Sequence, residues 1–141
     1  MASGIYDRFM ADLFNGEMDL EAHSIRVMLM DNVHAFDADH NVFTDVNAND
    51  IGNKVVYVAG GSALAGKAVT EGVGAGATKW AATNHAYGPA ETLTAYHAVL
   101  WNDTHATDDL ICSFDFGGAQ TCTNGTFTIQ WHANGIITIN D

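Results

Sequence analysis

The clearest local pattern in the chain is the stretch Thr126-Phe127-Thr128-Ile129-Gln130-Trp131-His132, which is followed by Asn134-Gly135 and then Ile136-Ile137-Thr138-Ile139. Apolar and polar side chains alternate on both sides of Asn134-Gly135, as they do in strands that are buried on one face. Asn-Gly favours the tight turn that joins two antiparallel strands, because both residues tolerate the positive φ that this turn requires. The stretch therefore predicts a β-hairpin and indicates an antiparallel fold.

Similar short segments recur along the rest of the chain and predict about eight strands in all, with turn residues between them. The other expected strands cover residues 24–30, 54–58, 62–70, 78–83, 92–101 and 110–116. No second helical pattern accompanies them, which argues against parallel βαβ units. We therefore expect a mainly β chain, an antiparallel β-sandwich of the jelly-roll type with one short N-terminal α-helix.

The expected helix covers residues 4–15, with Ser3 as its N-cap and Gly16 as a left-handed C-cap residue. A helix of this length is marginal in water, so its apolar face must dock on something. The expected organisation is a single domain, 1–141, with a helical arm over 1–16 and the β-sandwich over 17–141. The candidate contact residues are the apolar side chains of the helix: Ile5, Tyr6, Phe9, Met10, Leu13 and Phe14.

The charge balance argues against several classes of partner. The chain has 141 residues with 5 Lys and Arg against 17 Asp and Glu, a formal net charge of −12. Nucleic-acid binding depends on Lys and Arg that neutralise phosphates, and no basic residue follows Lys79. We expect no nucleic-acid partner and, for the same reason, no membrane partner. The sequence shows neither a transmembrane run nor a secretion signal, which predicts synthesis in a cytoplasm.

One segment comes close to a phosphate-binding loop. Gly61 to Lys67 matches G-x-x-x-x-G-K, but the next residue is Ala68, where the motif needs a hydroxyl to hold Mg²⁺. The motif must also open a helix, and the glycine-rich run that begins at Gly72 argues against one. We interpret the segment as a turn followed by a strand with Leu64 facing inward.

Metal-binding patterns are incomplete. Two Asp- and Asn-rich segments, residues 37–41 and 45–50, place oxygen ligands at alternate positions but lack the glycine and glutamate of a calcium loop. A bound divalent cation stays an alternative there to a solvated loop with side-chain-capped turns. The seven histidines form neither i, i+4 pairs nor a zinc motif. We expect no metal, no cofactor and no catalytic residues, and we expect Cys112 and Cys122 to be reduced.

Several segments resemble a family of small structural proteins of tailed bacteriophages. The matching stretches are Gly4-Ile-Tyr-Asp-Arg-Phe9, Ile25-Arg-Val-Met-Leu29, His34-Ala-Phe-Asp-Ala-Asp39, Asp45-Val-Asn-Ala-Asn-Asp50, Ala95-Tyr-His-Ala-Val99, Ile111-Cys-Ser-Phe-Asp-Phe116 and Phe127-Thr-Ile-Gln-Trp131. The similarity runs nearly end to end and is looser from Gly72 to Gly88. It implies a head decoration, or cement, protein that binds the outer capsid lattice, typically as trimers, and it supplies no catalytic residues.

The resulting hypothesis is a non-enzymatic virion protein on the outer surface of a phage head, with the major capsid protein and further copies of itself, as a homotrimer, for partners. The acidic excess fits the outside of a capsid better than the inside, where DNA would repel it. Two alternatives stay open: a tail, neck or fibre-knob component, and a cellular β-sandwich that binds carbohydrate or forms a filament. An exposed groove at Trp80 or Trp101 would favour carbohydrate binding.

Overall fold

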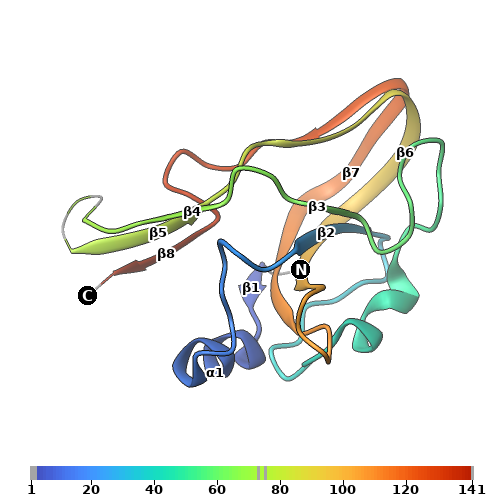
Figure 1. Ribbon diagram of the computed structural model, residues 1–141. Coiled ribbons are helices and arrows are strands. Elements are labelled where there is room, and N and C mark those ends of the chain that lie inside the picture. The colour runs from blue at the N-terminus through green and yellow to red at the C-terminus, as the bar shows by residue number, and fades with distance from the viewer. Residues whose placement is uncertain (1–2, 73, 75, 141) are drawn as a thin grey trace.

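The computed structural model describes residues 3–72, 74 and 76–140, which form a mainly antiparallel β structure with one α-helix (Figure 1). The helix α1 covers Asp7–Asn15, and the 3₁₀ turns η1 and η2 cover Phe43–Asp45 and Asn47–Asn49. The strands are β1 (Gly4–Ile5), β2 (Ile25–Met30), β3 (Ser62–Ala63), β4 (Ala68–Thr70), β5 (Ala77–Ala81), β6 (His85–Asn102), β7 (Leu110–Ile129) and β8 (Ile137–Asn140). None of the described helices is long and apolar enough to cross a membrane.

The C-terminal half of the chain is one long antiparallel hairpin that is interrupted and bent. β6 and β7 pair from Trp101 and Leu110, beside the turn, to His85 and Ile129 at their far ends. Beyond a break in both strands, antiparallel pairing resumes between β5 and β8. Figure 1 shows the ribbon folding over at its upper right and continuing sideways into a three-stranded sheet of β4, β5 and β8, which we call the arm.

Backbone geometry explains where the ribbon bends. Gly88 in β6 has a φ of 150°, and a Cβ on it would lie 2.7 Å from Thr126 Oγ1 on the neighbouring strand. The register between β6 and β7 shifts on both sides of Glu91. Such bulges increase the twist and bend the strand that contains them. β7 consequently curves back on itself, so that the rings of Phe116 and Phe127 lie 6.3 Å apart.

The five-stranded sheet has the order β1-β7-β6-β2-β3, and β2 in it is covered on both faces. The side chains of Ile25, Val27 and Leu29 belong to the larger of two buried clusters, whereas Met28 and Met30 belong to the smaller one. The alternation in the sequence predicts the same division, with Ile25, Val27 and Leu29 on one side of the strand and Arg26, Met28 and Met30 on the other. A strand buried on both sides reads as a nearly continuous apolar run, as β2 does.

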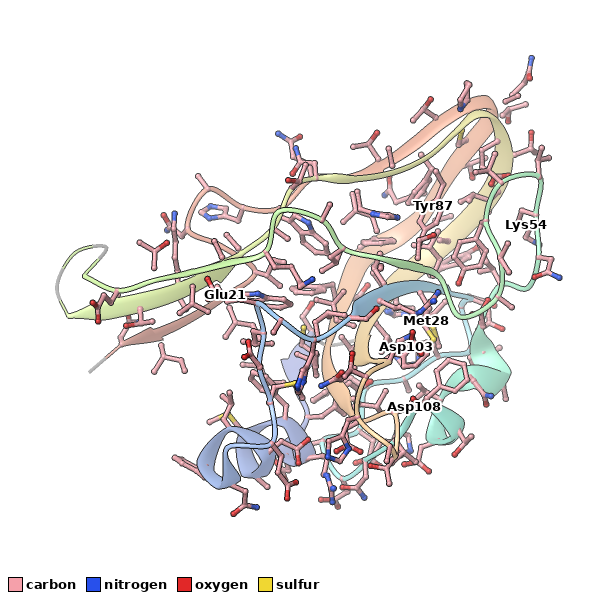
Figure 2. The ribbon with its side chains drawn as sticks, viewed as in Figure 1. Glu21, Met28, Lys54, Tyr87, Asp103 and Asp108 are labelled. Atoms are coloured by element: carbon pink, nitrogen blue, oxygen red, sulfur yellow. The ribbon has the colours of Figure 1, made fainter. Side chains whose placement is uncertain are left out.

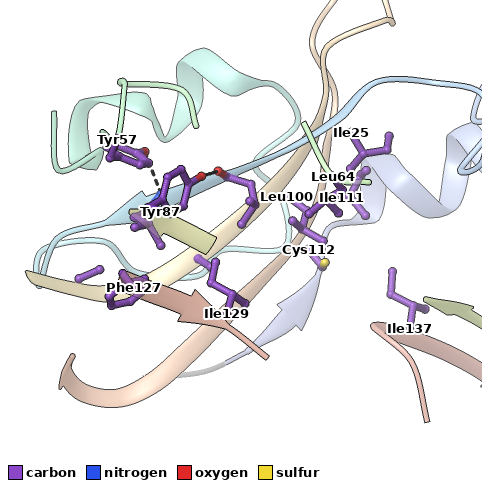
Figure 3. Close-up of a cluster of buried hydrophobic side chains, with 14 of the residues drawn as sticks. Ile25, Tyr57, Leu64, Tyr87, Leu100, Ile111, Cys112, Phe127, Ile129 and Ile137 are labelled. Carbon is purple, nitrogen blue, oxygen red and sulfur yellow. Dashed lines mark hydrogen bonds between the residues drawn. The ribbon is translucent and has the colours of Figure 1, made fainter. Parts of the chain in front are cut away.

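Two buried tyrosines tie the larger cluster to the backbone (Figure 3). Their rings, Tyr57 and Tyr87, meet edge to face with centroids 5.0 Å apart. The Tyr57 hydroxyl accepts the backbone N–H of Leu29 and donates to Asp50, and the Tyr87 hydroxyl donates to Val27 O at 2.7 Å. Because buried hydroxyls need partners, these bonds fix both rings in one position.

The fold class is as predicted, namely mainly antiparallel β with one N-terminal helix. The expected strands at 24–30, 78–83 and 92–101 correspond to β2, β5 and the larger part of β6. A jelly-roll order is not confirmed. The two sheets are open, and most of their pairing follows a single long hairpin with flanking strands.

The hairpin predicted around Asn134-Gly135 is wrong, because β8 pairs with β5 and not with the end of β7. A turn does occur there, since the backbone N–H of Gly135 donates to His132 O at 2.9 Å and Gly135 has a φ of 98°. This turn leads the chain from the body into the arm. The expected strands 110–116 and 126–132 fall mainly within the single strand β7.

Two further expected strands differ from the structure. Residues 54–58 form no strand, because the Glu91 carboxylate accepts the backbone N–H groups of Val55, Val56 and Tyr57. Residues 62–70 divide into β3 and β4, and Leu64 between them is buried as predicted. The hydrogen bonds to this carboxylate take the place of the strand-to-strand hydrogen bonds that these backbone N–H groups would otherwise need.

Candidate contact surface

The helix α1 is held against the turn of the β6–β7 hairpin by a buried charge cluster. Arg8 Nε lies 3.0 Å from Asp109 Oδ2 and 3.1 Å from Asp12 Oδ1. His105 Nδ1 lies 3.1 Å from Asp109 Oδ2, and Thr107 Oγ1 donates a hydrogen bond to the other oxygen of Asp109. Asp12 and Asp109 are almost completely buried. Burying acids is costly unless they are paired and hydrogen-bonded, so this cluster specifies where α1 docks.

The two buried carboxyl groups of this cluster differ in acidity. Burial and then the neighbouring Asp109 raise the pKa of Asp12 to about 6, against the effect of Arg8. Burial also opposes ionisation of Asp109, but hydrogen bonds from Thr107, Asp12 and Arg8 outweigh it and hold the pKa of Asp109 below its usual value. Two carboxyl groups in contact do not ionise independently. Below about pH 6, Asp12 is therefore the protonated member of the pair.

The helix begins later than the sequence predicts. Gly4–Ile5 pair with β7 as β1, so the helix starts at Asp7. Ser3 is not the N-cap, and its hydroxyl instead accepts the backbone N–H of Asp115. The C-terminal end is as predicted, because Gly16 has a φ of 72° and closes the last turn. The backbone N–H and C=O groups of Gly4 and Ile5 find more hydrogen-bond partners in the sheet than they would in a further helical turn.

The six candidate contact residues fall into three groups. Tyr6 and Phe9 are no more than 1% exposed and pack into the buried clusters of their own chain, so they are core residues and the contact prediction is wrong for them. Leu13 is partly buried against the larger cluster. Phe14, in contrast, is 86% exposed. The accessible apolar side chains at this end of the chain are Ile5, Met10 and Phe14.

An apolar groove of about 380 Å³ lies between α1 and the arm. Trp80 Nε1 donates to Leu20 O, and the Glu21 carboxylate accepts the backbone N–H of Val69, so the loop after α1 is tied to the arm. Figure 2 shows Glu21 beside the root of the arm. The apolar side chains that line the groove are Phe9, Leu13, Met18, Leu20, Val69, Trp80, Ile137 and Ile139.

The arm has two outer strands, and the Glu21 carboxylate covers part of the edge of β4 by accepting the Val69 N–H. In its order β4-β5-β8, the two outer strands each have one neighbour among the described residues. All residues of β4 are exposed, and Val69 and Ile139 are large apolar side chains in contact with solvent. Unpaired strand edges can add a strand from another chain. We call Phe14, Val69, Ile139 and the groove between α1 and the arm the contact surface.

The Asp- and Asn-rich loops form turns capped by side chains, which is the alternative to cation binding that the sequence left open. Asp45 Oδ2 accepts the backbone N–H groups of Asn41 and Val42. The Asp50 carboxylate accepts those of Gly52 and Gly60. Within the described residues, no group of three or more His, Cys, Asp or Glu side chains is placed to hold a metal ion.

The other motifs are structural. The segment Gly61 to Lys67 leads into β4 and not into a helix, so it lacks the helix N-terminus that a phosphate-binding loop needs. Cys112 and Cys122 are free thiols. Trp80 and Trp101 are both buried, so neither presents an exposed ring of the kind that would favour carbohydrate binding at these positions.

The sequence did not predict two buried polar features, which are the carboxylate of Glu91 and the histidine pair His34 and His97. Burial opposes ionisation of Glu91, but four backbone N–H bonds to its carboxylate outweigh it and lower its pKa. His34 and His97 lie 5.0 Å apart, with His34 Nε2 3.0 Å from Ser113 Oγ. Burial and the neighbouring His97 lower the pKa of His34 to about 4, so its ring is neutral at neutral pH. The available signal for Glu91 was its position as the one charged residue between Trp80 and Asn102.

Comparisons with protein families, with curated proteins and with solved structures found no significant match to this chain.

Proposed function

We propose that this chain is a structural protein of a tailed-phage virion, a head decoration protein that binds the outer capsid lattice and stabilises it. The observation that carries the proposal is the contact surface. Phe14 is an exposed aromatic side chain on a helix whose position is specified by the ion pair of the half-exposed Arg8 with the buried Asp109. Aromatic side chains are enriched in the buried cores of interfaces, and a rigid support lowers the entropy lost on binding.

The charge distribution supports the same proposal. Neither β4 nor β8 contains a charged residue, although the whole chain has a net charge of −12. The Glu21 carboxylate lies at the edge of β4, so β8 is the outer strand that can approach another acidic protein with little repulsion while the acidic loops stay in solvent. A protein that binds the assembled shell and not the free coat subunits stabilises the shell by mass action.

The direct test is to add the purified protein to undecorated heads of the phage that encodes it and to count bound copies against coat protein. We expect occupancy in near-constant ratio to the coat protein, and we expect Phe14→Ser to reduce it strongly. Val33→Ser is the matched control, because Val33 is also an exposed apolar side chain but lies outside the contact surface. A copy number far below that of the coat protein would instead indicate a tail or neck component.

A further inference from the structure

The C-terminal strand of the long ribbon carries no charged side chain from Phe116 to Asn140. The paired region of β6 contains one charged residue, Glu91, and it is completely buried. The exposed side chains of this part of the ribbon are mainly hydroxyls and amides, which is unusual in a chain that is otherwise strongly acidic.

The inner side of the bent strand β7 is hollowed by two adjoining cavities. Their volumes are about 390 and 330 Å³, and they adjoin at Phe116, Ile129 and Gln130, which line both. Each falls in the size range of sites for small organic ligands, roughly 300–1,000 Å³. We call the two cavities together the β7 groove. Its polar lining includes Gln120, Thr121, Thr126, Thr128, Gln130 and His132.

Aromatic rings form the other part of the lining. Phe116 lies 6.3 Å from Phe127, and Phe114 lies 5.7 Å from Trp131. The indole ring of Trp131 is held in place, because its Nε1 donates to Thr83 O at 3.1 Å. Trp131 is partly exposed, so one part of its ring is accessible from the groove that it lines. A fixed, accessible ring is a suitable platform for stacking.

We propose that the β7 groove binds a neutral oligosaccharide. Side-chain amides and hydroxyls both donate and accept hydrogen bonds, which matches the paired donor and acceptor character of sugar hydroxyls. The C–H faces of a sugar ring carry a weak positive potential and stack on the negative faces of aromatic rings. Both features occur in this groove, since Gln120 and Gln130 are exposed and lie with Trp131 along one strand and its extension.

The charge pattern selects among ligand classes. A phosphorylated or carboxylated ligand would need cations, but neither Lys nor Arg lines the groove, and Lys79 on the neighbouring strand β5 has its Nζ 3.3 Å from Ala133 O. The one carboxylate in the lining is Asp115, which accepts the backbone N–H of Gly117. A purely apolar ligand would displace water from the exposed glutamines without replacing its hydrogen bonds. An uncharged polyhydroxyl ligand can supply those hydrogen bonds.

This site is separate from the contact surface, because none of the residues that line the β7 groove lines the groove between α1 and the arm. The inference therefore goes beyond the proposed function. A decoration protein with this groove would add glycan binding to shell stabilisation, and glycan binding can be measured without capsids.

The test is a titration of the full-length protein with cellohexaose, maltohexaose and xylohexaose, followed by calorimetry and saturation-transfer NMR. We expect at least one of these neutral oligosaccharides to bind, and heparin fragments to bind none or far more weakly. Gln120→Ala and Gln130→Ala should each weaken binding by about three- to tenfold, as for the loss of one hydrogen bond. Trp131→Phe should keep more affinity than Trp131→Ala, because it retains an aromatic ring.

Thr123→Ala is the matched control, because Thr123 is an exposed hydroxyl of the same strand that does not line the groove. Circular dichroism of every variant would verify that it is folded. Failure of all three neutral oligosaccharides to bind would overturn the proposal, and so would binding that Gln120→Ala and Gln130→Ala leave unchanged. The protein could instead self-associate with increasing concentration, show no glycan binding, and lose this self-association in Gln130→Glu. That result would assign the groove to a second copy of the chain and would also overturn the proposal.

Discussion

Arg8 and Asp109 are separated by 101 residues in sequence, yet Arg8 Nε lies 3.0 Å from Asp109 Oδ2 and joins the first helix to the turn of the long hairpin. Figure 2 labels Asp103 and Asp108, which lie on this turn. The pair connects the N-terminal segment to a β ribbon that could otherwise pair without it. It therefore decides which side of α1 faces the body and which side, with Phe14, faces solvent.

Replacing Arg8 should destabilise the protein more than replacing Arg26. Both arginine side chains are 36% exposed, but the partner of Arg8 is 0% exposed and Asp103, the partner of Arg26, is 35% exposed. Arg8→Met should lower the free energy of unfolding by about 2–3 kcal/mol, because Asp109 stays buried without its cation. Arg26→Met should cost about 1 kcal/mol or less. Urea denaturation measures both, and equal losses would contradict the assigned role of Arg8.

The docking of α1 should weaken as the pH rises through about 6. The pKa of Asp12 is raised to about 6 in the folded protein, so its contribution is fully present below the unfolded pKa and is lost as the pH rises through the folded value. Asp12→Asn stays neutral at every pH. Its stability relative to the natural chain should therefore increase by roughly 1–3 kcal/mol between pH 5 and pH 7.5.

The difference in stability between Asp12→Asn and the natural chain isolates the effect of Asp12. The lowered pKa of His34 acts in the opposite direction, since its contribution is lost as the pH falls, but both proteins share it. Denaturation curves at several pH values supply the measurement. A difference that stays constant from pH 5 to pH 7.5 would show that Asp12 does not titrate in this range.

The carboxylate of Glu91 should be required for the order of residues 54–57. It accepts the backbone N–H groups of Val55, Val56 and Tyr57 from a buried position. Glu91→Gln should cost about 2–3 kcal/mol, because an amide has one acceptor oxygen and loses the charge that strengthens these bonds. Hydrogen exchange at these three amides should accelerate, whereas Glu71→Gln, at an exposed site, should leave them protected. Unchanged protection in Glu91→Gln would refute this assignment.

Two phenylalanines of α1 should respond very differently to truncation. Phe9 is buried and Phe14 is 86% exposed. Phe9→Ala should lower the free energy of unfolding by about 3–5 kcal/mol, through lost burial and the cavity left behind. Phe14→Ala should change it by about 0.5 kcal/mol or less. Thermal and chemical denaturation would show the contrast, and a large loss in Phe14→Ala would mean that Phe14 packs against the chain.

Local sequence signals predicted the elements well where a single strand or turn carries the signal. The apolar run in β2 was divided correctly between two faces, with Ile25, Val27 and Leu29 on one side. Gly16 ends the helix as expected, because a left-handed residue without a Cβ is a local requirement. The fold class follows from such signals, since alternation, turn residues and the lack of a second helical pattern are all readable along the chain.

Local sequence patterns do not show which strands pair with one another. The stretch 126–139 has the pattern of a hairpin, yet β7 pairs with β6 and β8 pairs with β5. Strand pairing is decided by burial of whole faces across the fold, and a longer ribbon with a turn at residues 103–109 buries more apolar surface than a short local hairpin. The buried Glu91 was hidden for the same reason, because its partners lie more than thirty residues away.

The amino-acid sequence by itself determined that this protein is a mainly antiparallel β chain with one short N-terminal helix and a strongly acidic surface, because composition and periodicity act over neighbouring residues. The tertiary structure alone decided that Tyr6 and Phe9 are core residues while Phe14 stays in solvent, and that the uncharged part of β7 after Asp115 curves around a groove. Both outcomes depend on contacts between distant segments. Their free energy is set by how completely the folded chain covers each side chain, which no local pattern contains.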